Sequence, residues 1–329
     1  MAKLFSSTLR TIEFLKRYWF LTALLAISLT TVESRSDTLY HIGRFIKNNH
    51  GPDIIMACIF MLSGFTLSIQ KVREGLLDFR GTLLALGVIF LVAPIWAAVF
   101  GLLPLDPGIV KGLFLVSVMP STLSSGVVMT AAAGGNAAHA LVVTIISNSL
   151  ATFTIPLSLT TLLRVFDQAV SVHVDNIAII LKIFYLAVLP LCAGMACRRM
   201  FSSLILRWEK EVVLTCQLLV LLVVWVAISQ TGEVVSNGGM KVIVLLLVVA
   251  AYHGLLLGSC WGIIRLSGRT KGNRESILFI GGQKTLPLSI VLQMAIFPDS
   301  GMVLLVCVLH QIVHLVMDGY LVERIKVTL

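Results

Sequence analysis

The sequence predicts an all-α polytopic membrane protein, and three observations support this fold class. Of the 329 residues, 57% are hydrophobic and only 12% are charged, about half the charged fraction of a soluble domain. Apolar stretches near the length of a bilayer span recur along the chain. Basic residues gather in alternate loops between these stretches, as on the cytoplasmic side of membrane proteins. This composition predicts that the chain lies in the lipid bilayer, which is its expected partner. It excludes a soluble enzyme, a disordered chain and a nucleic-acid binder.

Dividing the chain at its polar breaks predicts ten transmembrane helices. The first five cover Tyr18–Val32, Ile54–Ile69, Thr82–Leu105, Ile109–Ala133 and Ala137–Leu163. The second five cover Ile177–Cys197, Val212–Gln230, Val242–Leu266, Ser276–Phe297 and Met302–Val322. A helix needs about 20 residues to cross the hydrocarbon core, so the first two ranges are short. The first is interpreted as a retained span because no convincing signal-peptide cleavage site follows it.

The distribution of basic residues predicts the orientation. With ten spans and a cytoplasmic N-terminus, the cytoplasmic segments hold seventeen of the 25 Lys and Arg residues and the opposite loops hold six. This asymmetry predicts that both termini lie in the cytoplasm. The chain contains no Asn-x-Ser/Thr sequence, which favours a bacterial inner membrane over a glycosylated cell surface.

Five spans in each half predict two inverted repeats, residues 1–165 and 166–329. An odd number of spans turns the second half upside down relative to the first, a recurring arrangement in secondary transporters. A Thr-Leu pair at Thr122 in the fourth span recurs at Thr285 in the ninth, an offset of 163 residues near half the chain length.

Both of these spans also carry residues that interrupt a helix. In the fourth span Pro120 is followed by serines, a threonine and Gly126, and in the ninth Gly281 and Gly282 precede Pro287. Proline and glycine weaken the helical backbone in mid-span, and freed backbone groups are tolerated only in a cavity or against protein. One such helix is equally consistent with a packing kink. Two at corresponding places favour a binding site.

Three motifs add a family resemblance. The run Met119–Thr130 followed by Gly134-Gly135-Asn136 resembles the helix 4–5 signature of the sodium/bile-acid cotransporter family. The run Gln283–Ser289 resembles the crossover segment of its member-7-like branch, and Tyr252-His253-Gly254 is similar to a motif of helix 8. The resemblance implies a panel of helices 1, 2, 6 and 7, and a core of helices 3–5 and 8–10 in which broken helices 4 and 9 cross. It also implies an organic-anion substrate coupled to two sodium ions.

The sequence departs from this family at the implied sodium sites. An ungapped match keeps the helix 4 Ser at Ser125 and the helix 5 Thr at Thr144, but Gly126 stands where an Asn would be. Ile280 takes the place of the helix 9 Glu, and Lys284 that of a Gln one turn later. Sodium is held by oxygen ligands, preferably including an anionic one. We therefore do not expect two-sodium coupling, and the coupling ion is either sodium or a proton.

Lys284 is the most distinctive residue of the sequence. It lies about 15 Å from either end of its predicted span, so its side chain cannot reach the interface. An ionisable group at this depth marks a functional site by default. Three functions are consistent with it: a tethered cation in the vacated sodium site, a binding group for an anion, or a proton carrier. A structural ammonium that caps carbonyls of the broken helices is the fourth interpretation.

The remaining candidates are polar residues within the spans. The cation site at the crossover is predicted to comprise Ser124, Ser125, Thr144, Asn148, Gln283, Lys284 and Thr285. The substrate-cavity candidates are Ser121, Thr122, Ser147, His253, Ser289, Gln293 and His310. Singly, each hydroxyl or amide is also typical of a helix–helix hydrogen bond, and each histidine of a buried core residue. Asp318 is interpreted as a partner for a cytoplasmic arginine. No metal ligand set or resident cofactor is predicted.

These features predict a secondary transporter that moves a small organic anion by alternating access. Two alternatives remain open: a membrane regulator that keeps the fold without transporting, and a sodium-independent or proton-coupled uniporter. An enzyme is not expected, because no nucleophile–base pair or carboxylate dyad lies within the spans. The substrate and the oligomeric state are left open.

Overall fold

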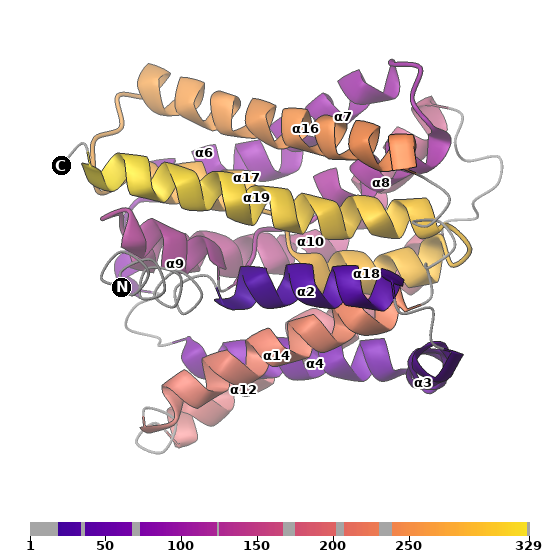
Figure 1. Cartoon of the computed structure of the whole chain (residues 1–329). Coiled ribbons are helices and arrows are strands. Elements are labelled where there is room, and N and C mark those ends of the chain that lie inside the picture. The colour runs from indigo at the N-terminus through magenta and orange to yellow at the C-terminus, as the bar shows by residue number, and fades with distance from the viewer. Residues whose placement is uncertain are drawn as a thin grey trace, which may run out of the picture.

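A computed structural model describes residues 19–33, 37–67, 73–123, 125–166, 175–201, 207–229 and 239–327. Every regular element in these ranges is helical, as the sequence predicts, and most run side by side (Figure 1). Seven helices of the described part are long and apolar enough to cross a membrane: Phe79–Gly101, Ala137–Val165, Asn176–Met200, Glu209–Ile228, Lys241–Leu266, Arg274–Ile296 and Gly301–Ile325.

The helices overlap the ten predicted ranges. In the first half they are α2 (Trp19–Glu33), α3 (Asp37–Asn48), α4 (Gly51–Thr66), α6 (Phe79–Gly87), η1 (Val88–Val92), α7 (Ala93–Gly101), α8 (Pro107–Ser117), α9 (Ser125–Ala132) and α10 (Ala137–Val165). In the second half they are α11 (Asn176–Ile183), η3 (Phe184–Val188), α12 (Leu189–Met200), α14 (Glu209–Ile228), α16 (Gly239–Leu266), α17 (Arg274–Gly282), α18 (Leu286–Ile296) and α19 (Gly301–Val327). The count of ten spans stays a prediction, because α2, α4 and α8 are shorter than a full span.

Two spans contain a π-helical turn just before a proline. η1 continues α6 into α7, where Pro94 is the second residue, and η3 continues α11 into α12 in the same way before Pro190. Proline has no N–H to donate and its ring crowds the preceding turn. Widening that turn keeps the chain helical through the proline, and π turns of this kind are frequent at functional sites.

The helix α3 is amphipathic and runs across the ends of its neighbours. The sequence places residues 37–48 in a loop, but they form a helix that Figure 1 views almost end-on. Tyr40, Ile42 and Phe45 are exposed on it, and Lys47 lies in its last turn. Such a helix suits the headgroup region of a bilayer, where its apolar side chains enter the lipid.

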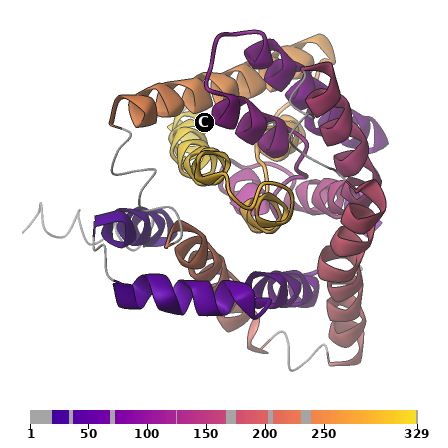
Figure 2. The same cartoon turned by 90° about the vertical axis from the view of Figure 1, so that its right-hand side faces the viewer.

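The helices form two groups. α4 packs on α12 and α14, and α14 packs on α2, whereas α19 packs on α8 and α16, and α17 packs on α16, α9 and α6. Figure 1 shows α4, α12 and α14 below α16, α17 and α19, and Figure 2 keeps this separation after a turn of 90°. α18 contacts both groups, through α14 and α4 on one side and α19 on the other.

An ion pair joins two loops at one end of the second group. Asp78 caps the start of α6 by accepting from the backbone N–H of Gly81, and its carboxylate accepts from Arg269, with N···O distances of 2.7 and 2.6 Å. Burial raises the pKa of Asp78, but the hydrogen bonds and charge of Arg269 and the Gly81 N–H outweigh it and hold that pKa below its usual value. The pair therefore fixes the segment after α16 to the start of α6.

Candidate functional site

The interruptions of the fourth and ninth predicted spans touch each other. Residues 118–124 separate α8 from α9, and residues 283–285 separate α17 from α18. The backbone N–H of Thr285 in the second interruption donates to the carbonyl oxygen of Pro120 in the first, at 2.9 Å. A carbonyl and an amide that the two helices leave unpaired thus satisfy each other deep in the protein.

The side chain of Gln283 connects the two interruptions. Its Oε1 atom accepts hydrogen bonds from the hydroxyls of Thr122 and Ser125, both at 2.8 Å, and these two hydroxyls lie 2.8 Å apart. Its Nε2 atom donates to Asp318 Oδ2 at 2.7 Å and contacts the sulfur of Met129 at 3.0 Å. Gln283 is fully buried. One amide therefore joins α9, the crossover and α19.

Lys284 holds three backbone carbonyls together. Its Nζ atom donates to the carbonyl oxygens of Ile89 at 2.8 Å, Ser117 at 2.8 Å and Met119 at 3.0 Å. Ile89 belongs to the π-helical turn η1, and the other two lie where α8 ends. The side chain is only 2% exposed. An ammonium surrounded by carbonyl oxygens is the arrangement that a bound monovalent cation would have, here supplied by the protein.

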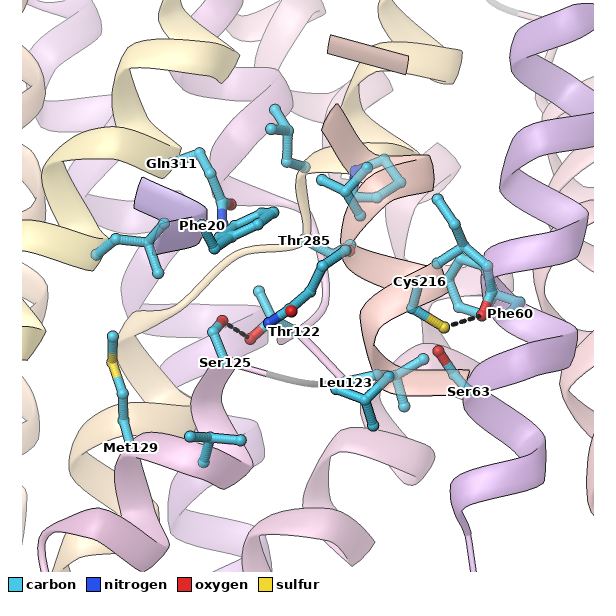
Figure 3. Close-up of a pocket in the computed structure, with 18 of the residues that line it drawn as sticks. Phe20, Phe60, Ser63, Thr122, Leu123, Ser125, Met129, Cys216, Thr285 and Gln311 are labelled. Carbon is cyan, nitrogen blue, oxygen red and sulfur yellow. Dashed lines mark hydrogen bonds between the residues drawn. The ribbon is translucent and has the colours of Figure 1, made fainter. Parts of the chain in front are cut away.

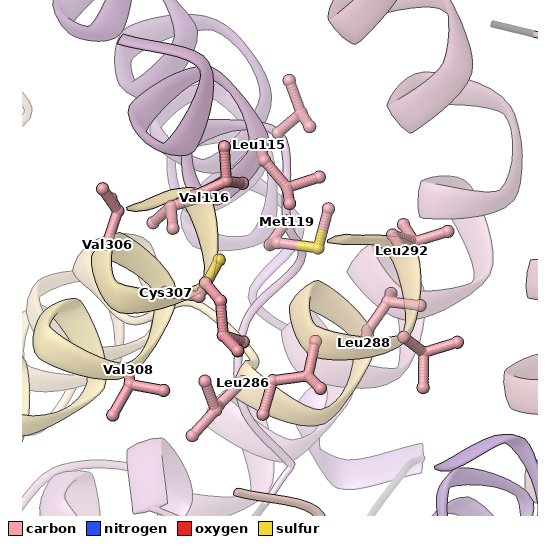
Figure 4. Packing of buried hydrophobic residues seen from close by; sticks show 14 of the residues in the cluster. Leu115, Val116, Met119, Leu286, Leu288, Leu292, Val306, Cys307 and Val308 are labelled. Carbon is pink, nitrogen blue, oxygen red and sulfur yellow. The ribbon is translucent and has the colours of Figure 1, made fainter. Parts of the chain in front are cut away.

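Apolar side chains surround this part of the crossover. Figure 4 shows them converging from α8, the interruption that follows it, α18 and α19: Leu115, Val116, Met119, Leu286, Leu288, Leu292, Val306, Cys307 and Val308. All are buried. Water is therefore excluded around these residues, and backbone carbonyls in such surroundings depend on protein donors.

The space beside Gly126 is filled by an aliphatic side chain. A Cβ atom on Gly126 would stand 2.5 Å from Ile280 Cδ1 and 3.2 Å from Gln283 Oε1. Gly126 and Ile280 occupy the two positions at which the resemblance implies an Asn and a Glu. The structure packs Ile280 against Gly126, so an aliphatic side chain fills the space beside this glycine.

The polar residues of α10 form a separate group beside α8. Asn148 Nδ2 donates to the carbonyl oxygens of Ser121 at 3.1 Å and Thr144 at 2.8 Å. The hydroxyls of Thr144 and Ser147 donate to carbonyls of their own helix. Ser121 Oγ and Asn148 Oδ1 are buried without a hydrogen-bond partner. These residues lie beside the first interruption, but none of them bonds to Gln283 or Lys284.

The remaining candidates have local partners, and one lies outside the described residues. Ser289 Oγ donates to carbonyls one turn earlier in α18, at Thr285 and Leu286. Gln293 Nε2 donates to the carbonyls of Phe297 and Ser300 and so closes the end of α18. Ser124 is the candidate that the structure does not describe. The roles of these residues stay predictions.

His253 and His310 belong to a buried cluster with Asp318. His253 Nε2 of α16 lies 3.0 Å from Asp318 Oδ1, and its ring centroid lies 5.5 Å from that of His310. The expected pairing of Asp318 with a cytoplasmic arginine is wrong. The carboxylate is fully buried and takes its hydrogen bonds from His253 and Gln283. Sequence distance hid this contact, because α16 and α19 are separated by both halves of the ninth span.

A cavity of about 210 Å³ opens beside the crossover, between the two helix groups (Figure 3). Its polar lining residues come from four helices and the two interruptions: Ser63, Thr122, Ser125, Gln217, Thr285 and Gln311. Most of the others are apolar, including Phe20, Phe60 and Leu315, and none of the described lining residues is charged. Of the substrate-cavity candidates, Thr122 lines this cavity.

Helix N-termini give the cavity a preference for negative charge. α9 begins at Ser125 and α18 begins directly after Thr285, and both residues line the cavity. The first turn of a helix carries a partial positive charge, which acts here although the Gly126 N–H donates to Thr122 Oγ1 and Pro287 has no N–H. The cavity can therefore attract an anionic group without a lysine or arginine, while its apolar walls accept a hydrocarbon body.

No sequence pattern marks several of the cavity residues. Phe20, Phe60, Gln217 and Gln311 belong to helices far apart in the chain and meet only through packing. Buried unpaired acceptors are the signal that the structure supplies, and Gln311 Oε1 is one of them. Within the described ranges, no group of three or more His, Cys, Asp or Glu residues is arranged to hold a metal ion.

A helical membrane protein in which two interrupted helices touch beside a largely apolar cavity with a few polar side chains has the form of a secondary transporter. Comparison with family models identifies the family. The model described as the SBF-like CPA transporter family matches residues 18–327, so the chain belongs to this family of membrane transporters.

Curated relatives carry transporter names. The chain is 28% identical over 280 residues to a probable sodium/metabolite cotransporter, BASS4, of Arabidopsis thaliana chloroplasts, covering 80% of this chain and 64% of the relative. It is 25% identical to the sodium/bile acid cotransporter 7-B of Xenopus laevis, covering 83% and 81%. It is 26% identical to the putative symporter YfeH of Escherichia coli, covering 82% of each chain. The chain spans less than two thirds of the length of the plant relative.

Proposed function

We propose that this protein is a secondary transporter that moves a small organic anion by alternating access without binding sodium. The observation that carries the proposal is the position of the Lys284 ammonium, hydrogen-bonded to three carbonyls of η1 and α8. This charge takes the place of a sodium ion at the crossover. A sodium ion brought near it would be repelled, and the packed Ile280 offers no oxygen to hold one.

The cavity supports the substrate class. The N-termini of α9 and α18 favour an anionic group near Ser125 and Thr285, and the hydroxyl of Thr122 adds a polar contact. The aromatic and aliphatic walls favour an apolar body. A volume of about 210 Å³ lies below the common range of about 300–1,000 Å³ for ligand pockets, so a compact amphipathic anion fits better than a large one.

The packing supports an alternating-access architecture of ten spans in two inverted repeats, 1–165 and 166–329. α2, α4, α12 and α14 pack on one another and correspond to the implied panel, and the interrupted helices lie in the other group. The cavity lies between the groups, with residues from α4, α14 and α18 in its lining. Rocking one group against the other would expose this cavity first to one side of the membrane and then to the other.

Uptake into proteoliposomes tests the proposal. The probes are radiolabelled taurocholate, a bile-acid anion, and benzenesulfonate, a compact amphipathic anion, in sodium chloride or choline chloride of equal ionic strength. We expect uptake of benzenesulfonate at equal rates in both salts. Thr122→Val removes one hydroxyl of the cavity and should slow uptake about 5–10-fold, the effect of losing one hydrogen bond of about 1–1.4 kcal/mol.

The matched control is Thr161→Val, because Thr161 is exposed and its hydroxyl bonds only to its own helix at Leu157. This variant should transport as the wild type does. Uptake that requires sodium would contradict the proposal. So would the absence of uptake of both anions under every imposed gradient, which would favour the non-transporting regulator.

A further inference from the structure

Four ionisable side chains that the proposed substrate cavity does not use lie together inside the second helix group. They are His253 of α16 and His310, His314 and Asp318 of α19, and none is more than 1% exposed. The three imidazole centroids form a triangle with sides of 5.5, 5.8 and 5.4 Å. Ionisable groups buried in a membrane protein are costly, and they persist where they carry ions or protons.

The histidine rings have unused nitrogens. His253 Nδ1, His310 Nε2 and both ring nitrogens of His314 are buried without a hydrogen-bond partner. By contrast, His139 of α10 lies within hydrogen-bonding distance of Thr82 at 3.2 Å and Ser276 at 2.7 Å, one with each ring nitrogen. Buried polar atoms are almost always paired, so four unpaired nitrogens in one cluster call for an explanation. Water and protons are the species that imidazoles exchange.

The cluster is connected to the cavity by one side chain. Asp318 accepts from His253 through Oδ1 and from Gln283 Nε2 through Oδ2. The other end of the same amide, Gln283 Oε1, accepts the hydroxyls of Thr122 and Ser125, which line the cavity. Two successive hydrogen bonds therefore connect Asp318 to the cavity, the first to Gln283 and the second from Gln283 to the cavity hydroxyls. A change of donor and acceptor roles at Asp318 can pass along them.

We propose that the His253–Asp318 pair binds a proton and that this proton reverses the Gln283 amide, which switches the cavity hydroxyls towards anion binding. An ionised Oδ2 can only accept, so it faces Gln283 Nε2, as in the structure. A proton on Oδ2 converts this oxygen into a donor. Gln283 then turns its Oε1 to accept that hydrogen, and its Nε2 faces Thr122 and Ser125 instead.

The reversal changes what the cavity offers. In the structure both hydroxyls donate to Gln283 Oε1, so their hydrogens are not available to a substrate. After the reversal Nε2 donates to the hydroxyl oxygens. One hydroxyl can still donate to the other across 2.8 Å, and the remaining hydroxyl hydrogen is free to point at an anion in the cavity. Proton binding and anion binding therefore favour each other, which is the thermodynamic requirement for proton–anion symport. This second half rests on the proposed transport function.

The other charged and titratable groups around the pair agree with this scheme. His310, His314 and Asp318 are spaced by four residues along one face of α19, over about 12 Å. That row supplies a path along which a proton can pass. Among the described residues, further ionisable side chains near the cluster are Lys284, Cys260 and Tyr252, whose ring centroid lies 5.8 Å from that of His310. The Lys284 ammonium donates its hydrogen bonds to three backbone carbonyls, whereas the Asp318 carboxylate pairs with His253.

Infrared difference spectroscopy of the purified protein in nanodiscs tests proton binding without a substrate. On stepwise acidification over the range in which the protein stays folded, the wild type should show the C=O stretch of a newly protonated carboxyl that Asp318→Asn lacks. Glu275→Gln is the matched control, because Glu275 is another fully buried carboxylate and pairs with Arg274 away from the cluster. Its spectrum should keep the Asp318 band. Identical wild-type and Asp318→Asn spectra would overturn the proposal.

A second measurement covers the reversal of Gln283. Benzenesulfonate stays ionised at every pH used, so any pH dependence of its thermal stabilisation of the protein comes from the protein. We expect the benzenesulfonate affinity derived from this stabilisation to rise at least about 3-fold on acidification of the wild type. In both Asp318→Asn and Gln283→Leu the affinity should be independent of pH. The same pH dependence in those variants as in the wild type would overturn the proposal.

The two measurements separate the proton site from the transport function. A pH-dependent Asp318 band in a protein that moves neither anion would uphold the proton site and contradict the proposed transport. Sodium-independent uptake of benzenesulfonate with no Asp318 band would uphold the transport and overturn the proton site. Retained folding of each variant is checked by gel filtration, and His253→Gln provides a second removal of the pair if Asp318→Asn does not fold.

Discussion

Replacing Lys284 by methionine tests whether its ammonium holds the crossover together. The substitution keeps a flexible side chain of similar length but removes three hydrogen bonds, to Ile89, Ser117 and Met119. Each buried carbonyl left without a donor costs about 1–3 kcal/mol. The variant no longer buries a charge, which is itself costly in a membrane protein, so the net loss of stability is smaller than the sum of the three hydrogen bonds.

We expect a net loss of about 2–4 kcal/mol in the free energy of unfolding for Lys284→Met. At roughly 2–4 °C per kcal/mol this lowers the unfolding temperature by roughly 5–15 °C. The assay is intrinsic-fluorescence thermal unfolding in nanodiscs. The matched control is Lys182→Met in α11, whose ammonium forms a partly exposed pair with Asp53 at 3.1 Å and should contribute less than about 1 kcal/mol. A Lys284→Met protein as stable as the wild type would refute the role of the ammonium.

Three further predictions concern the geometry. With the six native cysteines replaced, cysteines at Ser125 and Gln283 should be joined by a short thiol crosslinker, and failure to crosslink would contradict the contact between the interruptions. A cysteine at Arg199 should react with an impermeant reagent only from the cytoplasmic side, and labelling in intact cells would contradict the orientation. The stability that Asp78 gains from Arg269 is full above the ordinary pKa of aspartate and is lost as the pH falls through its lowered pKa. Asp78→Asn should therefore lower the unfolding temperature at neutral pH and not in acid, and equal losses at both would contradict the pairing.

Local composition was enough to predict the helices of the apolar runs and two of their interruptions. Apolar run length places the helices of the predicted spans to within a few residues, and Pro120 and the Gly281-Gly282 pair mark the places where α8 and α17 stop. The contact between the interruptions is expected only from the family resemblance, because no local pattern encodes which two breaks meet. The helix α3 was missed because its apolar residues, such as Phe45, are too few for a span and lie among charges.

Partners that come from distant helices could not be predicted from the sequence. The depth of Lys284 indicates that it needs a partner, and capping of broken-helix carbonyls is one of the predicted interpretations, but the contribution of Ile89 depends on the π-helical turn η1. Asp318 looks like a residue near the end of a span until α19 is placed against α16, where His253 meets it. The pairing follows from the tilt and register of two packed helices, which no short motif specifies.

Direct measurement of sodium binding tests the central claim, that the ammonium of Lys284 takes the place of a sodium ion. Radioactive sodium is titrated onto the purified protein in a scintillation proximity assay, with the double variant Ile280→Glu/Lys284→Gln beside the wild type. The double variant places a carboxylate next to Gly126 and removes the competing charge. The wild type should bind no sodium saturably, and the double variant should gain saturable binding. Saturable sodium binding to the wild type, unchanged in Lys284→Gln, would contradict the claim.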